Sequence, residues 1–414
     1  MEDKTLKVTI NGTGFAADYS AQCYGMIPHK NGVAIELAGV TSGRIANAEA
    51  FAEKHGVGQA FAGHAEMLKD VRPDIDNIAC ANFAHGPYAI EAAEAGVPVI
   101  VLEKPPVIWP GYPEGREAGA ETRKNESMDF LRAVLDAVRE NGSKLLYAED
   151  FIYLDGVKAL VELLAESQKA DKGKVLYQFG VCAHQGSHAP AYDTPSLSGG
   201  GALFQKTCHP LGPCLFLKQV EGILRNGKPI RPAKVSAIAM QVLKHQPESS
   251  GDFARLTVVF EDETVAEALG HDLNITGIRN ELSIITDFAK YDIRANPNNE
   301  NEVFLPAAEP AGNILFREKL PTPIGTSFPR PNQFYSHGYV SEMSDAVDCA
   351  LDPDRHPQSG PLMAWDTMAV LMAGYESAEK QGQFVDVSEL IGSREFKENE
   401  MPDPARFGRV LQRT

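Results

Sequence analysis

A lysine stands where an apolar strand pattern stops. Residues 97–102 are apolar, the charged pair Glu103 and Lys104 follows, and two prolines then restrict the backbone. Because ligands of open parallel sheets bind at the carboxyl ends of strands, Lys104 is well placed to contact a substrate. An ammonium group there could bond a substrate hydroxyl and stabilise charge as the hydroxyl proton leaves. The alternative is that Lys104 only forms a surface salt bridge with Glu103.

A second chemical motif lies between the first strand pattern and the first helix pattern. The stretch "NGTGFAA", residues 11–17, fits G-x-G-x-x-A through Gly12, Gly14 and Ala17. The first glycine permits a tight turn, the second lets a pyrophosphate approach the backbone, and the alanine keeps the helix close to the sheet. The helix N-terminus then offers amides to phosphates, so we predict a dinucleotide site rather than a plain turn. The other residues of this turn expected at the cofactor are Thr13, Phe15 and Ala16.

The end of the second strand pattern bears on the choice between NAD and NADP. An acidic residue often binds the ribose hydroxyls of NAD at this point, but this chain has "VTSGR" at 40–44. Ser42 and Arg44 could instead hold a 2′-phosphate, with Arg44 stacking on the adenine. The sequence therefore predicts NAD or NADP with a slight preference for NADP. Alternatively, Arg44 only caps a loop in solvent.

Two histidines, His184 and His188, lie four residues apart in "CAHQGSHAPAYD". On a helix this spacing could hold a metal ion. The segment follows a strand pattern, however, and contains Gly186 and Pro190, which favour a loop. We therefore predict that the two histidines line a substrate site and that no metal is bound.

The order of elements predicts two domains of different type. Up to residue 150, continuous apolar strands alternate with helices, which is typical of a doubly wound parallel sheet, a Rossmann domain over 1–150. In 151–392 long strands follow one another, which predicts an α/β domain with an open, mostly antiparallel sheet and helices on one face. We expect the polar tail 393–414 to dock on a partner subunit and the proline-rich segment 306–331 to be an ordered surface excursion. The predicted strands of the first domain are 6–12, 33–41, 74–81, 97–103 and 143–150, and the clearest helices of the chain are 15–27, 47–56, 86–96, 126–142 and 360–382.

Composition excludes several classes of function. A net charge of −17 over 414 residues disfavours binding to nucleic acid or to an acidic membrane surface. No apolar run approaches the ~20 residues that span a bilayer, and the first residues lead directly into a strand pattern rather than a signal peptide. The six cysteines form no CxxC pair and are typical of free thiols in a reducing compartment. We expect a soluble cytoplasmic protein.

Several motifs together resemble one family. "AHGPYAIEAAEAGVPVIVLEKP" (84–105), "GGGALFQKTCH" (199–209) and "AGYESAEKQGQFVDV" (373–387) follow the G-x-G-x-x-A turn in order. Over nearly the whole chain the sequence is similar to the glucose–fructose oxidoreductase / inositol dehydrogenase family, usually called Gfo/Idh/MocA. The resemblance implies a nicotinamide cofactor and a carbohydrate substrate.

The resemblance also implies roles for individual residues. Lys104 would project into the substrate pocket and, with Glu103, also contact the cofactor, and Pro105 would fix the backbone next to the nicotinamide. His209 matches the catalytic histidine, which acts as general base, although a histidine beside Pro210 could also be a satisfied core residue. The residues that the resemblance places near the cofactor ribose and nicotinamide are Asn82 and His85.

The sequence departs from the family at the substrate pocket. Gln205 stands where many relatives have an aspartate, Lys206 beside it is unusual, and Gly212 replaces another frequent aspartate. The pocket is thus expected to be less acidic, and Lys104 with Lys206 could favour an anionic sugar. Tyr153, which follows "YAED" and the strand pattern 143–150, could stack on or bond a sugar ring, or simply pack the following helix. The residues expected at the substrate are Gln205, Lys206, Tyr153, His184 and His188.

These expectations lead to one preferred function and two alternatives. We expect hydride transfer between a nicotinamide cofactor and a secondary hydroxyl of a sugar, with Lys104 and His209 handling the hydroxyl proton. An NAD-dependent glycosidase, which oxidises, eliminates and re-reduces, is the first alternative, and a non-catalytic sensor is the second. The open face of the second sheet is expected to form a homodimer or homotetramer.

Overall fold

The computed structural model describes most of the chain. The described residues are 5–27, 32–186, 194–243, 251–274, 277–295, 303–305, 325–327 and 337–407. His188, most of the proline-rich segment 306–331 and residues 408–414 of the tail lie outside them, so the predictions made for these residues are not addressed by the structure.

The first domain is built on a parallel sheet of six strands, as the sequence predicts. The strand order is β3-β2-β1-β4-β5-β6, and every neighbouring pair is parallel. In β1 the apolar residues Leu6, Val8 and Ile10 are fully buried, since helices cover both faces of such a sheet. The strands are β1 (Thr5–Asn11), β2 (Ala34–Thr41), β3 (Ala60–Phe61), β4 (Ile75–Ile78), β5 (Val99–Glu103) and β6 (Lys144–Ala148). The helices between them are α1 (Phe15–Gly25), α2 (Ile45–His55), α3 (His64–Val71), α4 (Asn82–Glu94) and α5 (Ala120–Glu140).

The second domain contains a mixed, mostly antiparallel sheet of seven strands in the order β12-β11-β7-β10-β9-β8-β15. Only β7 and β10 pair in parallel. The turn 261–264 joins β9 to β10, with Glu263 at φ 66°. The strands are β7 (Val175–His184), β8 (Pro232–Met240), β9 (Phe253–Phe260), β10 (Val265–His271), β11 (Ile278–Thr286), β12 (Lys290–Arg294) and β15 (Val385–Asp386), and β13 (Val303–Leu305) pairs separately with β14 (Gly325–Ser327).

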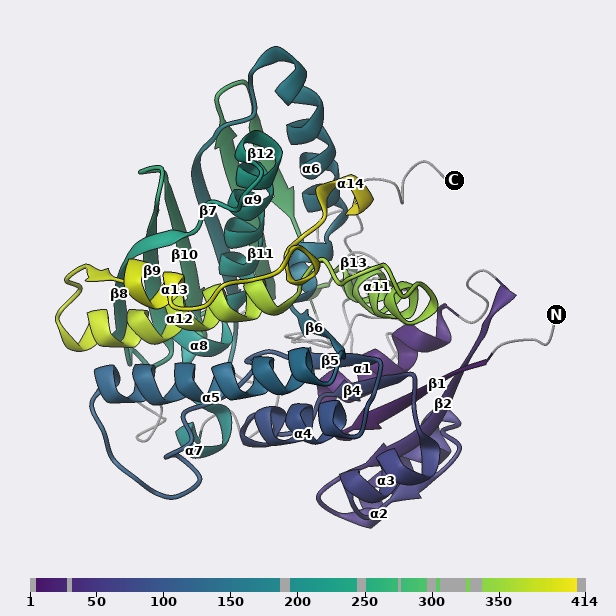
Figure 1. The fold of residues 1–414 in the computed structure, drawn as a ribbon. Coiled ribbons are helices and arrows are strands. Elements are labelled where there is room, and N and C mark those ends of the chain that lie inside the picture. Colours follow the sequence, from purple (N-terminus) through teal and green to yellow (C-terminus); the bar gives the residue numbers. More distant parts are fainter. Residues whose placement is uncertain are drawn as a thin grey trace.

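Helices contact the second sheet from one face. Gly180 of β7 packs against Pro210, and Leu256 of β9 against Gly374, and both sheet residues point to the same side. Figure 1 shows α12 crossing this sheet with α5 of the first domain running beside it. The helical elements after residue 149 are η2 (Asp150–Tyr153), α6 (Asp155–Ser167), η3 (Gln168–Ala170), α7 (Pro195–Ser198), α8 (Ala202–Gln205), α9 (Cys208–Asn226), α11 (Tyr339–Leu351), α12 (Pro361–Glu379), α13 (Ser388–Gly392), η5 (Glu398–Glu400) and α14 (Pro404–Phe407).

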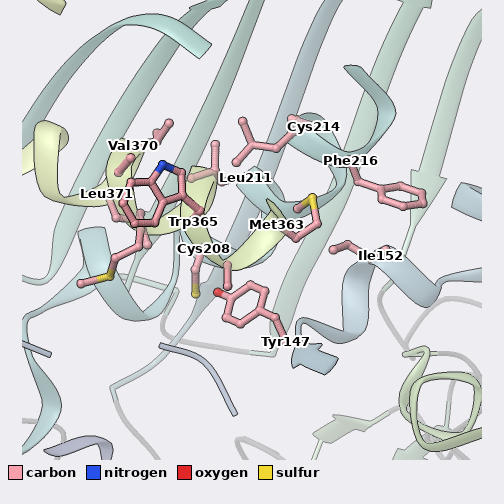
Figure 2. Packing of buried hydrophobic residues seen from close by; sticks show 14 of the residues in the cluster. Tyr147, Ile152, Cys208, Leu211, Cys214, Phe216, Met363, Trp365, Val370 and Leu371 are labelled. Atoms are coloured by element: carbon pink, nitrogen blue, oxygen red, sulfur yellow. The ribbon is translucent and has the colours of Figure 1, made fainter. Parts of the chain in front are cut away.

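One hydrophobic core continues from the first domain into the second. Trp365 of α12 and Leu211 of α9 are buried in the same cluster as Tyr147 of β6 and Leu131 of α5. Figure 2 shows the part of this core in which side chains of α9 and α12 meet Tyr147. Because the two sheets share this core, the edge of the first sheet is held against the start of α9. No helix in the described ranges is long and apolar enough to cross a membrane, and all six cysteines are unpaired.

Two segments pack elsewhere than expected from the sequence. The helix α11, from the predicted second domain, packs on the first one: Val340 and Met343 share a cluster with Leu6 and Val8 of β1. The tail from residue 393 to 407 packs on its own chain. Arg139 of α5 donates two hydrogen bonds to the carboxylate of Glu400, at 2.8 and 2.6 Å, so this part of the tail does not require a partner subunit to dock.

Candidate functional site

A cavity lies at the carboxyl edge of the parallel sheet and is lined by both domains. Its space, including the mouth open to solvent, is about 870 Å³. Five parts of the chain meet there: the start of α1, the end of β5 and β6, the end of β7 with α8 and α9, the start of β11, and the start of α11. The lining residues are Phe15, Ala16, Tyr19, Glu103, Lys104, Ala148, Asp150, Phe151, Cys182, His184, Gln205, Lys206, His209, Asn280, His337, Tyr339 and Glu342.

The turn before α1 has the geometry that a dinucleotide requires. Gly12 has φ +114°, and a Cβ there would collide with the carbonyl of Ala79. A Cβ on Gly14 would instead meet no atom within 4 Å, so this position leaves space at the helix start. Gly14 is the N-cap of α1, and no side chain of the described residues caps that helix end. Backbone amides at the start of α1 are therefore open to phosphate oxygens, and these residues fit a dinucleotide.

Hydroxyl groups occupy the end of β2. The Oγ1 of Thr13 and the Oγ of Ser42 lie 3.2 Å apart, which joins the glycine turn to the strand end. Thr41 donates to the carbonyl of Phe61 at 3.2 Å and is buried. Arg44 is exposed at the N-cap of α2. This edge thus presents hydroxyl groups and a guanidinium at the position where NAD-binding proteins often have an acidic residue for the ribose hydroxyls.

Lys104 bridges the two domains at the end of β5. Its ammonium group donates to the carbonyl of Gln205 at 3.4 Å, and its backbone amide donates to Glu103 Oε2 at 2.9 Å. Burial raises the pKa of Glu103 to about 7, although the charge of Lys104 opposes this rise. The Lys104–Pro105 peptide is cis. The lysine is thus held at the cavity by contacts with the backbone of α8.

His209 lies at the start of α9 and is held by two acidic residues. Its Nδ1 is 2.8 Å from Glu149 Oε1 and 3.4 Å from Asp150 Oδ1, and its ring packs near Phe151. Burial lowers the pKa of His209, but the charge of Glu149 and the hydrogen bonds with Asp150 and Glu149 together outweigh burial and raise it to about 9, with Lys104 opposing. Because Nδ1 is engaged by Glu149, Nε2 is the nitrogen that can serve a substrate in the cavity.

Lys206 and His184 form a second polar group in the same cavity. Lys206 Nζ is 2.8 Å from His184 Nδ1 and 3.3 Å from Asp272 Oδ1, and it also donates to the carbonyl of Gly186 at 3.3 Å. Burial lowers the pKa of Lys206, and the charge of Asp272 opposes this change. The side chain of Gln205 donates from Nε2 to the carbonyl of Gly200. Of the residues expected at the substrate, His184, Gln205 and Lys206 thus meet at the cavity.

Tyr153 does not line the cavity. It is 2% exposed, its hydroxyl donates to Asp345 Oδ2 at 2.9 Å, and the same oxygen accepts from the amide of Ser359 at 3.2 Å. A sugar ring therefore cannot reach it in this structure, and the packing alternative describes its placement.

Asn82 and His85 are buried next to the cofactor turn rather than in the cavity. Asn82 donates to the carbonyl of Ser198 at 2.8 Å. His85 Nδ1 is 2.7 Å from the carbonyl of Pro105, and burial lowers the pKa of this histidine. A neutral His85 with its proton on Nδ1 fixes the backbone that follows Lys104, so both residues hold loops around the site.

The structure adds acidic residues that the sequence prediction did not assign. Glu149 and Asp150 follow β6 at the carboxyl edge, and that position in "YAED" was a signal that could have found them. Asp272 follows β10, and Glu342 comes from α11, far along the chain. No local pattern links Asp272 or Glu342 to the site.

The cluster of Glu149, Cys208 and His209 does not require a metal ion. Ligand atoms of Glu149, Cys208 and His209 lie within 4.8 Å of one another. However, burial raises the pKa of Cys208, and its Sγ donates to the carbonyl of Gln205 at 3.3 Å. A protonated thiol is a poor ligand, so we assign no metal site to these residues.

Comparisons with known proteins agree on the fold. Residues 6–128 match the model of an oxidoreductase family with an NAD-binding Rossmann fold. A D-glucoside 3-dehydrogenase of Escherichia coli (strain K12) is 33% identical over 110 residues, which is 27% of this chain and 30% of that protein. The match with this curated relative therefore spans less than a third of either chain.

Solved structures resemble the chain over most of its length. GenD2 from gentamicin A biosynthesis, in complex with NAD, has a TM-score of 0.73 at 19% identity and covers 92% of this chain and 96% of its own. A scyllo-inositol dehydrogenase from Lactobacillus casei with bound NAD(H) and scyllo-inositol has a TM-score of 0.69 at 16% identity, with coverages of 93% and 100%. At such identities the likeness shows the fold of both domains.

Proposed function

Because residues 6–128 match the Gfo/Idh/MocA family of oxidoreductases with an NAD-binding Rossmann fold, we propose that this chain belongs to that family and transfers hydride between a nicotinamide cofactor and a secondary hydroxyl of a sugar or sugar derivative. The observation that carries the proposal is the pairing of His209 with Glu149 in one cavity with Lys104, directly beyond the glycine turn. The matched D-glucoside 3-dehydrogenase and the inositol dehydrogenases of similar fold are named for cyclic polyols, which supports this substrate class.

Each residue has a defined task in this reaction. The nicotinamide supplies the site that accepts or returns the hydride. His209 Nε2 takes the hydroxyl proton, while Glu149 holds the ring and stabilises the imidazolium that results. Lys104 bonds the reacting oxygen and favours its negative charge as the proton leaves. Gly12, Gly14 and the first amides of α1 would hold the pyrophosphate.

We also propose that the protein slightly prefers NADP over NAD. Ser42 and the exposed Arg44 are the groups that would meet a 2′-phosphate. Replacing Arg44 by alanine should weaken binding of NADPH more than binding of NADH, as measured by fluorescence titration. A wild-type protein that binds NADH tenfold more tightly than NADPH would overturn the preference.

Charged groups of both signs lie around the cavity. Lys206 is paired with Asp272, so its charge is compensated within the protein. Burial raises the pKa of Glu103 to about 7 and also raises the pKa of Glu342, so these two lining carboxyl groups lose negative charge. The charge of Lys104 therefore still supports an anionic sugar as a candidate beside a neutral one. Comparison of a sugar with its uronic acid would decide between the two.

The decisive experiment screens sugars, sugar acids and glycosides with NAD and with NADP. Reduced-nicotinamide absorbance and released reducing sugar are followed in the same wells. Net cofactor reduction without bond cleavage supports the dehydrogenase. Release of sugar without net cofactor reduction indicates the NAD-dependent glycosidase instead. Cofactor binding without either reaction on any compound indicates a sensor.

We further propose a cytoplasmic homo-oligomer. The unpaired cysteines are consistent with a reducing compartment. The face of the second sheet opposite the helices carries half-buried apolar residues in register, such as Val259, Val265 and Tyr177. Burial of this face against a second copy would give a homodimer, and two dimers a homotetramer.

A further inference from the structure

The cavity holds more ionisable groups than alcohol oxidation requires. Removing a hydroxyl proton needs one acceptor, and His209 has that position. Lys206 and His184 form a separate group at the end of β7 and β10, with Asp272 beside them. Both Lys206 and His184 line the same cavity as Lys104 and His209.

The surroundings of Lys206 suit proton transfer better than simple ion pairing. Lys206 is 5% exposed, and its ammonium group lies beside a histidine nitrogen, one carboxylate and one backbone carbonyl. A neutral amine in this place donates a hydrogen bond to the carbonyl of Gly186 and accepts one from the His184 ring. Burial and the charge of Lys104 favour the neutral amine, whereas the charge of Asp272 favours the cation. A buried lysine with this balance can act as a general base.

We propose that Lys206, together with His184, moves the proton on the carbon next to the carbonyl group of the oxidised sugar. This inference rests on the proposed function, because that reaction supplies the ketone. The C–H bond breaks and its proton passes to Nζ of Lys206. Its electron pair forms the C=C bond of an enolate, and the carbonyl electrons move to the oxygen that Lys104 holds. Return of a proton restores the ketone.

This step gives the protein a further activity, exchange of the carbon-bound hydrogen with water. Where the carbon beyond carries a glycosidic oxygen, the enolate can also release that oxygen with its bonding electrons. Lys206 would then perform the step that the glycosidase alternative requires.

The test supplies the ketone directly. Methyl 3-keto-β-D-glucopyranoside is incubated in D2O with protein and NAD, which cannot reduce it, and proton NMR follows the hydrogens on the carbons that flank the carbonyl. We expect the wild-type protein to exchange one of them faster than buffer does, and Lys206→Met to lose this acceleration by about 10²- to 10⁴-fold. Lys206→Arg, which keeps a cation for Asp272 but cannot deprotonate, should lose it equally. Lys234→Met, which is exposed on β8, is the matched control and should exchange like the wild type.

The outcomes separate this inference from the proposed function. A wild-type protein that reduces the ketone with NADH but exchanges no faster than buffer overturns the inference and leaves the dehydrogenase intact. Variants of Lys206 that exchange at the wild-type rate also overturn it. A wild-type protein that neither exchanges this ketone nor oxidises any sugar of the screen with NAD or NADP contradicts both. Binding of NADH by each variant shows that it is folded.

Discussion

At the scale of single residues, the pairing of His209 with Glu149 predicts the pH dependence. With its pKa raised to about 9, His209 is mostly protonated at neutral pH and accepts a proton only as the pH rises. We expect kcat/KM for alcohol oxidation to increase with pH up to about 9, and kcat/KM for ketone reduction to fall over the same range. Glu149→Gln removes the charge that raises the pKa, so the rise for oxidation should shift to lower pH. An unchanged profile would show that Glu149 does not set this pKa.

The loss of His209 itself should mainly reduce turnover. His209→Asn removes the proton acceptor but leaves the cofactor turn in place, so kcat for oxidation should fall about 10²- to 10⁴-fold while NADH binding is retained. Steady-state kinetics and a fluorescence titration measure the two quantities. Undiminished activity of His209→Asn, or of Lys104→Ala, would contradict the site assignment.

Single residues differ in how well the sequence predicted them. Lys104 and His209 follow recognisable motifs, and the structure brings both to one cavity. Gln205 was expected to contact substrate; it lines the cavity, and its side-chain amide also donates to the carbonyl of Gly200. Lys206 was recognised as unusual, yet its partner Asp272 follows β10, and strand order cannot be read from one sequence. Contacts between residues far apart in the sequence depend on the fold, so they cannot be predicted from the sequence alone.

At the scale of elements, the two glycines before α1 should respond differently to substitution. Gly12→Ala places a Cβ against the Ala79 carbonyl at φ +114°, so it should lower the free energy of unfolding by about 1–3 kcal/mol. Gly14→Val points into space without neighbours, so the fold should persist while cofactor binding weakens at least tenfold. Thermal unfolding without cofactor and NADH titration distinguish the two. Equal cofactor affinity of Gly14→Val and wild type would place the pyrophosphate elsewhere.

Elements with strong apolar periodicity were predicted well, and short or interrupted ones were not. The strands β5 and β6 are nearly continuous apolar runs, which are typical of a sheet covered on both faces. The helix α9 was not predicted because Pro210, Gly212 and Pro213 interrupt its pattern. Tertiary burial outweighs this local preference, since α9 is buried along most of its length. The short strand β3 and helix α3 gave no clear periodicity and were also missed.

The tail should stabilise the domain on which it packs. Arg139→Met removes the two-pronged contact with Glu400 and should lower the free energy of unfolding by about 1 kcal/mol, measured by urea denaturation. Lys169→Met is the matched control, because its ion pair with Glu166 is exposed and should contribute nothing measurable. Equal stability of Arg139→Met and wild type would mean that the tail contact is not formed in solution.

At the scale of the whole molecule, the helix-free side of the second sheet predicts an assembly. Val265 of β10 and Ile285 of β11 both lie beside Tyr177 on this face. The double variant Val265→Asp, Ile285→Asp should be monomeric but folded, because carboxylates would be buried without partners in the interface. Light scattering after gel filtration gives the mass. A wild-type monomer would refute the proposed oligomer.

The return of α11 to the first domain has a consequence for how the protein is made. Until residue 351 has been synthesised, Leu6, Val8 and the neighbouring apolar residues of the parallel sheet lack the helix that covers them. The first domain therefore exposes an apolar surface during synthesis until residues 151–351 have also been made. Residues 1–150 alone should aggregate when expressed, and adding a linker with 337–352 should restore solubility. The nascent chain is thus expected to depend on chaperones through most of its synthesis.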